Sequence, residues 1–287
     1  LAWIASDDAP PRLVLPGERP ADPAGGALAM LLGPLAELLD AAAAGLEAGP
    51  TGPGEAALDY RRQWQQAETA AWAARGRAEA GADGPLHEHQ IAPLLRAALP
   101  AGAWLAVGNS SPVRDLDHDL PPDGRGLGLL HQRGAAGIDG LVAGAAGARS
   151  VGAPPLALLL GDVSLLHDAG GLAAAAAVPG PLAIVVVNND GGRIFERLPL
   201  GRDAGLAAAR ERLFVTPHGR GFGGLAATWG LAHARVDTPA ALARALAQAL
   251  HAEAPMLVEA CPRPGGSAER AALLSAMAHA AEQAVAA

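Results

Sequence analysis

Two segments in the second half of the chain place oxygen-bearing side chains directly after apolar runs. Asp162 follows one run, and Asn188 and Asn189 follow the next. Because such runs are typical of buried strands, we expect the polar side chains after them to lie at one edge of a sheet. Mg²⁺ binds about six oxygen atoms and takes few of them from protein. The pattern therefore predicts a Mg²⁺ site made by Asp162, Asn189 and a backbone carbonyl of the turn 190–192, with room left for a diphosphate.

Each segment also has a purely structural interpretation. Asp162 could cap the helix that follows it, because aspartate is a preferred residue at helix starts. The sequence NNDGG at 188–192 is good turn sequence whatever its function. The two segments together, at this spacing and each after a strand, favour the metal site.

Composition narrows the class of protein. The chain has 287 residues, of which 51% are hydrophobic, enough for one sizeable core and a smaller appendage. A net charge of −8 and an isoelectric point near 5.6 leave no basic surface for nucleic acid. All 21 basic residues are arginines, so a Walker-A phosphate loop and a lysine Schiff base are both excluded.

The same sequence predicts a reducing, cytoplasmic location. Cys261 is the only cysteine, so no internal disulfide can form. No apolar run approaches the roughly 20 residues of a membrane span, and the first four residues are too short for a signal sequence. The chain begins with Leu1 rather than Met, which hints that it was cut from a longer protein.

The distribution of glycine and proline residues divides the sequence into two parts. An apolar segment ends near Pro16, and a helix-like run covers 26–48. The Gly- and Pro-rich segment 49–54 predicts a linker, and a helix is expected at 55–80. We predict a boundary there, with 1–58 as an appendage and linker and 59–287 as the main domain.

Beyond Gly84 the chain alternates regularly between short apolar runs and Ala- and Leu-rich helical stretches. The runs are 104–107, 127–130, 156–160, 183–187, 232–236 and 256–260. This alternation predicts a doubly wound α/β domain with a parallel sheet. Polar or glycine-rich segments begin right after four of the runs, at Gly108, His131, Gly161 and Asn188. Ligands of such sheets bind outside the carboxyl ends of the strands, so we expect the site there.

Five ordered segments carry a family resemblance. They are VGNSSPVRDLD, QRGAAGIDGLVAGAAG, LLLGDVSLLHD, VVVNNDGGRIFERLP and FVTPHGRGFGGLAATWGL. The interval of 24 residues at 164–187 between GDV and NN resembles the motif of thiamine-diphosphate enzymes. Together the segments resemble the C-terminal part of the 2-succinyl-5-enolpyruvyl-6-hydroxy-3-cyclohexene-1-carboxylate synthase family, over about 59–260. The resemblance implies that 1–58 is the end of a middle domain and 59–287 the diphosphate-binding domain.

The resemblance implies roles for individual residues. Asp162, Asn189 and the Gly191 carbonyl would hold Mg²⁺ or Mn²⁺ and, through it, thiamine diphosphate. Ile138 would hold the cofactor in its V shape. The other implied cofactor positions are Asn109, Gly137, Gly161, Val163 and Ser164.

A second set of positions would bind substrates. Ser110, Arg114 and Arg133 match residues that bind carboxylates, which suits the planar guanidinium group. The positions Ile194, Phe195 and Leu198 match an apolar wall beside the second substrate.

These positions also have structural alternatives. Arg114 could form a surface ion pair, and the apolar trio could be core. The segment His87-Glu88-His89 is expected to lie at a helix start, and none of the nine histidines forms a recognised metal motif.

The activity implied by the resemblance is decarboxylation of 2-oxoglutarate and addition of the product to isochorismate, a step of menaquinone biosynthesis. In this family a glutamate that protonates the cofactor's aminopyrimidine lies in an N-terminal pyrimidine-binding domain, and we expect that domain to be missing from this chain. We expect activity only with that domain, as the protein's own missing portion or as a separate chain, within a homodimer or tetramer. Two alternatives stay open: another thiamine-diphosphate carboligase or decarboxylase, and a non-catalytic cofactor-binding or scaffold subunit.

Overall fold

The structure, a computed structural model, describes residues 13–17, 22, 27–47, 52, 54–79, 84–120, 126–132, 136–152 and 154–286. The chain forms two compact units, Leu1–Gln65 and Gln66–Ala287. In the first unit, strands β1 (Leu13–Gly17) and β2 (Ala29–Leu32) pair in parallel and are followed by helix α1 (Leu35–Glu47).

The prediction of a helix over 26–48 was wrong for the residues before Leu35. Residues Ala29–Leu32 form β2, and the helix begins only at Leu35. Pro34 explains the difference, because proline disfavours helical backbone at the residue before it and has no N–H to continue a helix from upstream. The helix expected from residue 55 is α2 (Glu55–Glu79).

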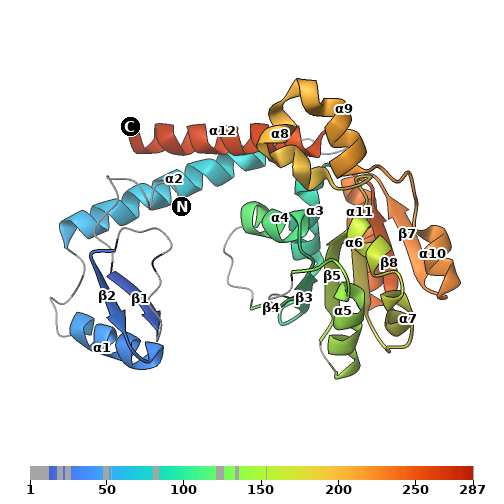
Figure 1. Ribbon diagram of the computed structural model, residues 1–287, viewed down its shortest axis with the longest axis horizontal. Helices are drawn as coiled ribbons and strands as arrows, with labels where there is room; N and C mark the ends of the chain where they lie inside the picture. The colour runs from blue at the N-terminus through green and yellow to red at the C-terminus, as the bar shows by residue number, and fades with distance from the viewer. Residues whose placement is uncertain are drawn as a thin grey trace. The chain divides into compact units, whose positions relative to one another are not determined.

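The second unit contains the predicted six-stranded parallel sheet (Figure 1). Its strands are β3 (Trp104–Val107), β4 (Gly128–His131), β5 (Leu156–Gly161), β6 (Leu182–Val187), β7 (Ala232–Val236) and β8 (Met256–Ala260). They lie in the order β4-β3-β5-β6-β8-β7, and every neighbouring pair is parallel. The doubly wound α/β fold is confirmed, and each strand matches its predicted run within one residue.

Helices connect the strands. The longer ones are α3 (Glu88–Ala98), α4 (Ser111–Asp119), α5 (Leu141–Ser150), α6 (Asp162–His167), α7 (Gly171–Ala176), α10 (Gly223–Thr228), α11 (Pro239–His251) and α12 (Gly266–Ala286). Five short helical turns join β6 to the segment before α10: η1 (Arg193–Arg197), α8 (Pro199–Arg202), η2 (Ala204–Leu206), α9 (Ala207–Arg210) and η3 (Glu211–Val215). Within the described ranges, no helix is both long and apolar enough to cross a membrane.

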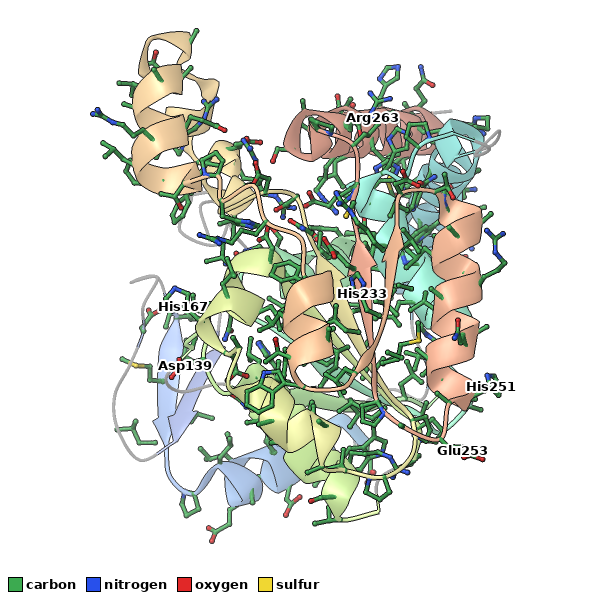
Figure 2. All side chains as sticks on the ribbon, turned by 90° about the vertical axis from the view of Figure 1, so that its right-hand side faces the viewer. Asp139, His167, His233, His251, Glu253 and Arg263 are labelled. Atoms are coloured by element: carbon green, nitrogen blue, oxygen red, sulfur yellow. The ribbon has the colours of Figure 1, made fainter. Side chains whose placement is uncertain are left out.

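The core lies on both faces of the sheet because side chains alternate along each strand. On one face Leu159 of β5 packs with residues of α3 and α11. On the other face Leu158 packs with residues of α5, α6, α7 and α10. Side chains fill the space between the sheet and the helices on both faces (Figure 2).

The strand order changes direction at β3, which pairs with β4 on one side and β5 on the other. From β3 the chain continues to β4 on one side of the sheet order, and from β5 it continues to β6 on the other side. A crevice therefore forms outside the carboxyl ends of β3 and β5, where ligands of doubly wound sheets bind. Asn109 and Asp162 follow β3 and β5 at this place.

Candidate functional site

A cavity of about 200 Å³ lies at the carboxyl ends of β3, β5 and β6. We call it the Asp162 cavity. It brings together ten of the residues singled out from the sequence: Ser110, Ile138, Gly161, Asp162, Val163, Ser164, Asn189, Gly191, Ile194 and Phe195. Ser111, Pro112, Asp115, Val187, Gly192 and Arg193 complete its lining.

Asp162 is the most buried acidic group of the cavity, with 2% of its surface exposed. It is the first residue of α6, so Gly161 and not Asp162 is the N-cap. Its Oδ1 accepts the N–H of Val163 at 2.7 Å, and its Oδ2 accepts the N–H of Gly191 at 2.8 Å. The Nε2 atom of His218 lies 3.1 Å from the same Oδ2.

The turn after β6 has a backbone that favours glycine. Gly191 has a φ of +117°, and a β-carbon there would collide with the carbonyl oxygen of Val215. Asp190 also has a positive φ, 63°. Its Oδ1 accepts the N–H groups of Gly219 at 2.7 Å and His218 at 2.9 Å. These bonds, that of Gly219 above all, lower the pKa of Asp190 and tie the turn to the segment that carries His218.

The two asparagines of this turn have different surroundings. The amide nitrogen of Asn188 donates to Glu259 Oε1 at 2.8 Å and to the Arg220 carbonyl at 2.9 Å. The amide nitrogen of Asn189 donates to Glu88 Oε2 at 2.9 Å. Asn189 lines the Asp162 cavity and Asn188 does not. Only the second asparagine is therefore placed to offer its oxygen beside Asp162.

Glu259 anchors Asn188 from inside the sheet. It is fully buried and also accepts the N–H of Phe222 at 3.0 Å and Nε2 of His233 at 2.9 Å. His233 extends from β7 (Figure 2). Burial raises the pKa of this carboxyl, but the donors from Phe222, Asn188 and His233 outweigh it, and the pKa lies below its usual value.

Arg193 braces the same turn from the other side. Its Nε donates to the carbonyl of Asn189 at 3.2 Å, and its Nη2 donates to that of Asp190 at 3.4 Å. Its Nη1 lies 3.0 Å from both Glu196 and Glu211. The guanidinium group thus fixes the backbone of the predicted metal ligand.

The side of the cavity after β3 is also held by specific bonds. The amide nitrogen of Asn109 donates to the Gly137 carbonyl at 2.6 Å, and its oxygen lies 3.1 Å from His131 Nε2. Ser110 has a φ of 71°. Asn109 and Gly137 do not line the Asp162 cavity themselves, but their bond holds the segment that carries Ile138 against the end of β3.

The position of Ile138 depends further on Asp168, at the end of α6. Its Oδ2 accepts the N–H groups of Val142 at 2.6 Å and Ala143 at 3.4 Å, at the start of α5. Gln132 donates to the Gly140 carbonyl at 2.8 Å. The described residues just before α5 are therefore held by hydrogen bonds from Asn109 and Gln132.

Two of the predicted substrate residues, Arg114 and Leu198, lie outside the lining of the Asp162 cavity. Arg114 is exposed on α4, and its Nη1 donates to the Ser110 carbonyl at 2.6 Å. Leu198 is 44% exposed. Neither lines the Asp162 cavity. Arg133 lies outside the described residues. Ile194 and Phe195 do line the cavity, and the Phe195 ring packs edge-on against Phe214 at 5.5 Å between centroids.

A buried chain of alternating charges adjoins the site. It contains six side chains, each linked to the next: Glu88, Arg197, Asp115, Arg270, Asp119 and Arg75. The distances between linked atoms are 3.5, 2.9, 3.0, 2.7 and 2.8 Å. The negative charges of the three carboxylates balance the positive charges of the three guanidinium groups. Burial nevertheless raises the pKa of Asp115 to about 6.

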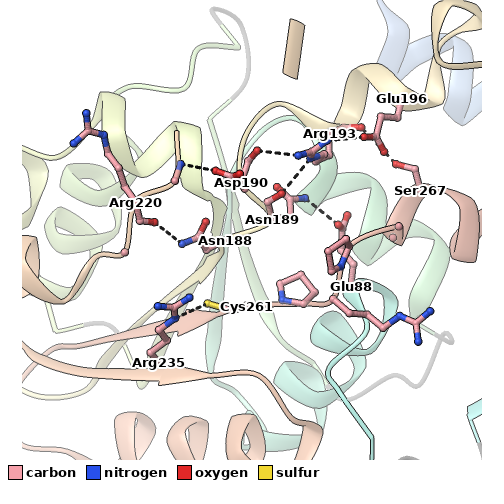
Figure 3. Close-up of a pocket in the computed structure, with 17 residues that line it drawn as sticks. Glu88, Asn188, Asn189, Asp190, Arg193, Glu196, Arg220, Arg235, Cys261 and Ser267 are labelled. Carbon is pink, nitrogen blue, oxygen red and sulfur yellow. Dashed lines mark hydrogen bonds and ion pairs between the residues drawn. The ribbon is translucent and has the colours of Figure 1, made fainter. Parts of the chain in front are cut away.

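A second cavity, of about 470 Å³, lies outside the carboxyl ends of β6, β7 and β8 (Figure 3). We call it the Arg235 cavity. Glu88, Asn189 and Arg193 line it, together with Arg235 and Cys261. Asn189 and Arg193 line both cavities. The predicted metal ligand thus has one cavity on each side.

A group outside both cavities has metal-ligand chemistry but unsuitable surroundings. His87, His89 and Glu269 place ligand atoms within 4.8 Å of one another. Arg263 already pairs with Glu269 at 2.7 Å. Burial and the nearby Arg75 guanidinium lower the pKa of His89 to about 4. The positive charge of Arg75 also opposes the binding of a cation at this group. His87 is the N-cap of α3, which confirms the expected helix start.

The donor atoms at the Asp162 cavity fit a magnesium ion. A carboxylate, an amide oxygen and the carbonyls of the 190–192 turn are the hard donors that Mg²⁺ prefers. Asp162 is buried with two N–H donors and one imidazole around it, and a dication would offset its charge further.

Sequence reasoning missed three residues of this site. His218 and Arg193 lie inside segments that carried the resemblance, so their positions could have been singled out. Nothing in the sequence pointed to Glu88.

Comparisons with known proteins identify relatives of this chain. Residues 127–260 match the family described as "Thiamine pyrophosphate enzyme, C-terminal TPP binding domain". Three curated relatives carry the name 2-succinyl-5-enolpyruvyl-6-hydroxy-3-cyclohexene-1-carboxylate synthase. The protein from Sorangium cellulosum is 45% identical over 95% of this chain and 44% of its own length. Those from Myxococcus xanthus and Halorubrum lacusprofundi are 44% and 39% identical, over 58% and 64% of this chain and 28% and 30% of their own lengths.

This chain therefore spans less than half the length of these relatives. The matches confirm the resemblance drawn from the five motif segments. The chain is a homologue of the C-terminal portion of the 2-succinyl-5-enolpyruvyl-6-hydroxy-3-cyclohexene-1-carboxylate synthases and contains the C-terminal thiamine-pyrophosphate-binding domain of such enzymes.

Proposed function

We propose that the chain binds thiamine diphosphate through Mg²⁺ or Mn²⁺ at the Asp162 cavity, as part of a synthase of menaquinone biosynthesis. That synthase decarboxylates 2-oxoglutarate and adds the product to isochorismate. The observation that carries the proposal is the convergence of Asp162, Asn189 and Gly191 on one cavity at the ends of β5 and β6. The relatives carry the name of this synthase, and the substrates are those that the sequence resemblance implies.

In this proposal Asp162, Asn189 and the Gly191 carbonyl hold the metal, and Ile138 supports the cofactor. When bound, thiamine diphosphate supplies the carbanion chemistry, while the protein binds and orients the reactants. The remaining cofactor positions are Asn109, Gly137, Gly161, Val163 and Ser164. The positions proposed for substrate are Ser110, Arg114, Arg133, Ile194, Phe195 and Leu198.

The proposal includes a partner. A pyrimidine-binding domain, on the same protein or on another chain, completes the active site, and the assembly is a homodimer or tetramer. The proposal places the acid for the aminopyrimidine on that domain, as the family resemblance implies.

Calorimetric titration with thiamine diphosphate in Mg²⁺ tests the proposal, for the chain alone and with a pyrimidine-binding domain added. Asp162→Ala and Asn189→Ala should each weaken binding by more than tenfold, or about 1.4 kcal/mol. Asp117→Ala, which changes an exposed carboxylate on α4, is the matched control and should bind normally. Unchanged affinity in both site variants would remove the metal assignment.

A further inference from the structure

Glu88 contacts the predicted metal ligand without entering the Asp162 cavity. Its Oε2 accepts the amide nitrogen of Asn189 at 2.9 Å, and Figure 3 shows this bond beside the Arg235 cavity. Glu88 is the first residue of α3 and is 6% exposed. It lines only the Arg235 cavity of the two. Among the proposed metal ligands, Glu88 hydrogen-bonds to Asn189.

The chemistry of the two side chains determines how Asn189 is turned. An asparagine side chain has an oxygen and an NH₂ group of similar shape, and only the oxygen binds Mg²⁺. A carboxylate offers acceptors only. Contact with Glu88 thus admits one orientation, in which the NH₂ group faces α3 and the oxygen faces away from it.

We propose that Glu88 is a positioning residue of the metal site, which turns the Asn189 amide so that its oxygen is presented to Mg²⁺. The inference rests on the proposed function of Asn189 as a metal ligand. Partners that orient metal ligands commonly affect metal affinity by 10- to 100-fold.

Glu88 is itself held on its other oxygen. Oε1 lies 3.5 Å from Nη2 of Arg197, the next member of the buried charge chain. Arg197 is fixed in turn by Asp115 at 2.9 Å. The carboxylate therefore has one oxygen for Arg197 and one for Asn189.

The packing of α12 leaves room for this carboxylate. A β-carbon at Gly266, the first residue of α12, would lie 2.9 Å from Glu88 Oε2. Gly266→Ala thus pushes the carboxylate aside without removing its charge or any hydrogen-bonding group. This substitution perturbs the contact independently of any change at Glu88.

The test must separate positioning from simple charge, since any nearby carboxylate attracts a cation. Glu88→Asp and Gly266→Ala keep the charge and break the contact. Glu269→Gln removes a charge near the start of α3 and α12 and leaves the contact intact. The measurement is the Mg²⁺ concentration that gives half-maximal thiamine-diphosphate binding, in the full chain with its pyrimidine-binding domain.

We expect Glu88→Asp to raise this concentration at least about tenfold and Gly266→Ala to raise it several-fold, with Glu269→Gln within about twofold of the parent. Saturating Mg²⁺ should restore cofactor affinity in both contact variants. Normal Mg²⁺ dependence of Glu88→Asp and Gly266→Ala would overturn the inference. So would an equal loss in Glu269→Gln, which would mean a long-range charge effect.

A double-mutant cycle excludes a merely structural role. In an Asn189→Ala background, Glu88→Asp should have no further effect on Mg²⁺ dependence, because there is no amide left to orient. A loss that persists there would overturn the inference. If Asn189→Ala alone changes nothing, the proposed metal site fails. If Asn189→Ala weakens binding and Glu88→Asp does not, only the role of Glu88 fails.

Discussion

The carboxylate of Asp162 accepts the backbone N–H of Gly191 at 2.8 Å, although 29 positions separate the two residues. The bond joins the ends of β5 and β6, which are neighbouring strands. It also holds the turn that follows β6 beside Asp162, which lies directly after β5. The predicted metal site is thus preformed by a contact between its own ligands.

Gly191→Ala should destabilise this turn. The positive φ and the collision with the Val215 carbonyl together should cost about 1–3 kcal/mol of unfolding free energy. Denaturant unfolding of the two proteins measures this loss. Gly147→Ala is the matched control, because nothing lies within 4 Å of a β-carbon at that position of α5. We expect the control to be neutral or more stable by up to about 1 kcal/mol. Equal effects at the two glycines would contradict the strain argument.

Arg193→Met should weaken cofactor binding while the fold is kept. The substitution retains an apolar stem of similar length but loses the donors to the carbonyls of Asn189 and Asp190. Bonds from a charged donor contribute about 1.5–3 kcal/mol, so affinity should fall by at least about tenfold. Titration with thiamine diphosphate at fixed Mg²⁺ is the measurement. Arg244→Met, at an exposed position of α11, should bind normally, and similar losses in both variants would disprove a specific role.

The sheet could be predicted from the sequence because most of its strands, such as β5 and β6, are continuous apolar runs bounded by glycine, proline and polar residues. Their order in the sheet could not, since it depends on how the helices pack rather than on any one run. The prediction of a helix over 26–48 was wrong before Leu35, because Pro34 outweighs the helical propensity of the alanines and leucines that precede it.

The candidate residues that directly follow strands, such as Asp162 and Asn189, line one cavity, whereas contacts between residues far apart in the sequence were not predicted. Glu88 and Asn189 are 101 positions apart, and Arg75 and Asp119 are 44 apart. In the sequence, charged residues of a helix such as Glu88, Arg75 and Asp119 cannot be told apart from ordinary solvent-facing residues. Their burial becomes visible only when α2, α3, α4 and α12 bring them together.

Asp168→Ala should destabilise the second unit through the start of α5. The carboxylate accepts the N–H groups of Val142 and Ala143, and loss of a helix-capping acceptor costs about 0.5–2 kcal/mol. Asp139→Ala, at an exposed position just before the same helix, is the control and should change stability by less than about 0.5 kcal/mol. Thermal or denaturant unfolding compares the two, and an equal loss in both would show that Asp168 does not act as the cap.

The pH dependence of stability should carry a contribution from Asp115. Burial raises its pKa to about 6 in the folded protein, from 3.8 in the unfolded chain. Between these values the folded state binds the proton and the unfolded state does not, so this group stabilises the fold as pH falls from about 7 to about 4. The shift corresponds to at most about 3 kcal/mol at 1.36 kcal/mol per pKa unit.

Asp115→Asn isolates this contribution, because asparagine keeps the shape of the side chain and does not titrate. Other acidic groups lower the stability of both proteins in acid, so the quantity to follow is the difference in unfolding free energy between parent and variant. That difference should shift in favour of the parent by about 1–3 kcal/mol as pH falls from about 7 to about 4. A difference that stays constant, or that shifts toward the variant, would show that Arg197 and Arg270, which lie 2.9 and 3.0 Å from the carboxylate, outweigh its burial.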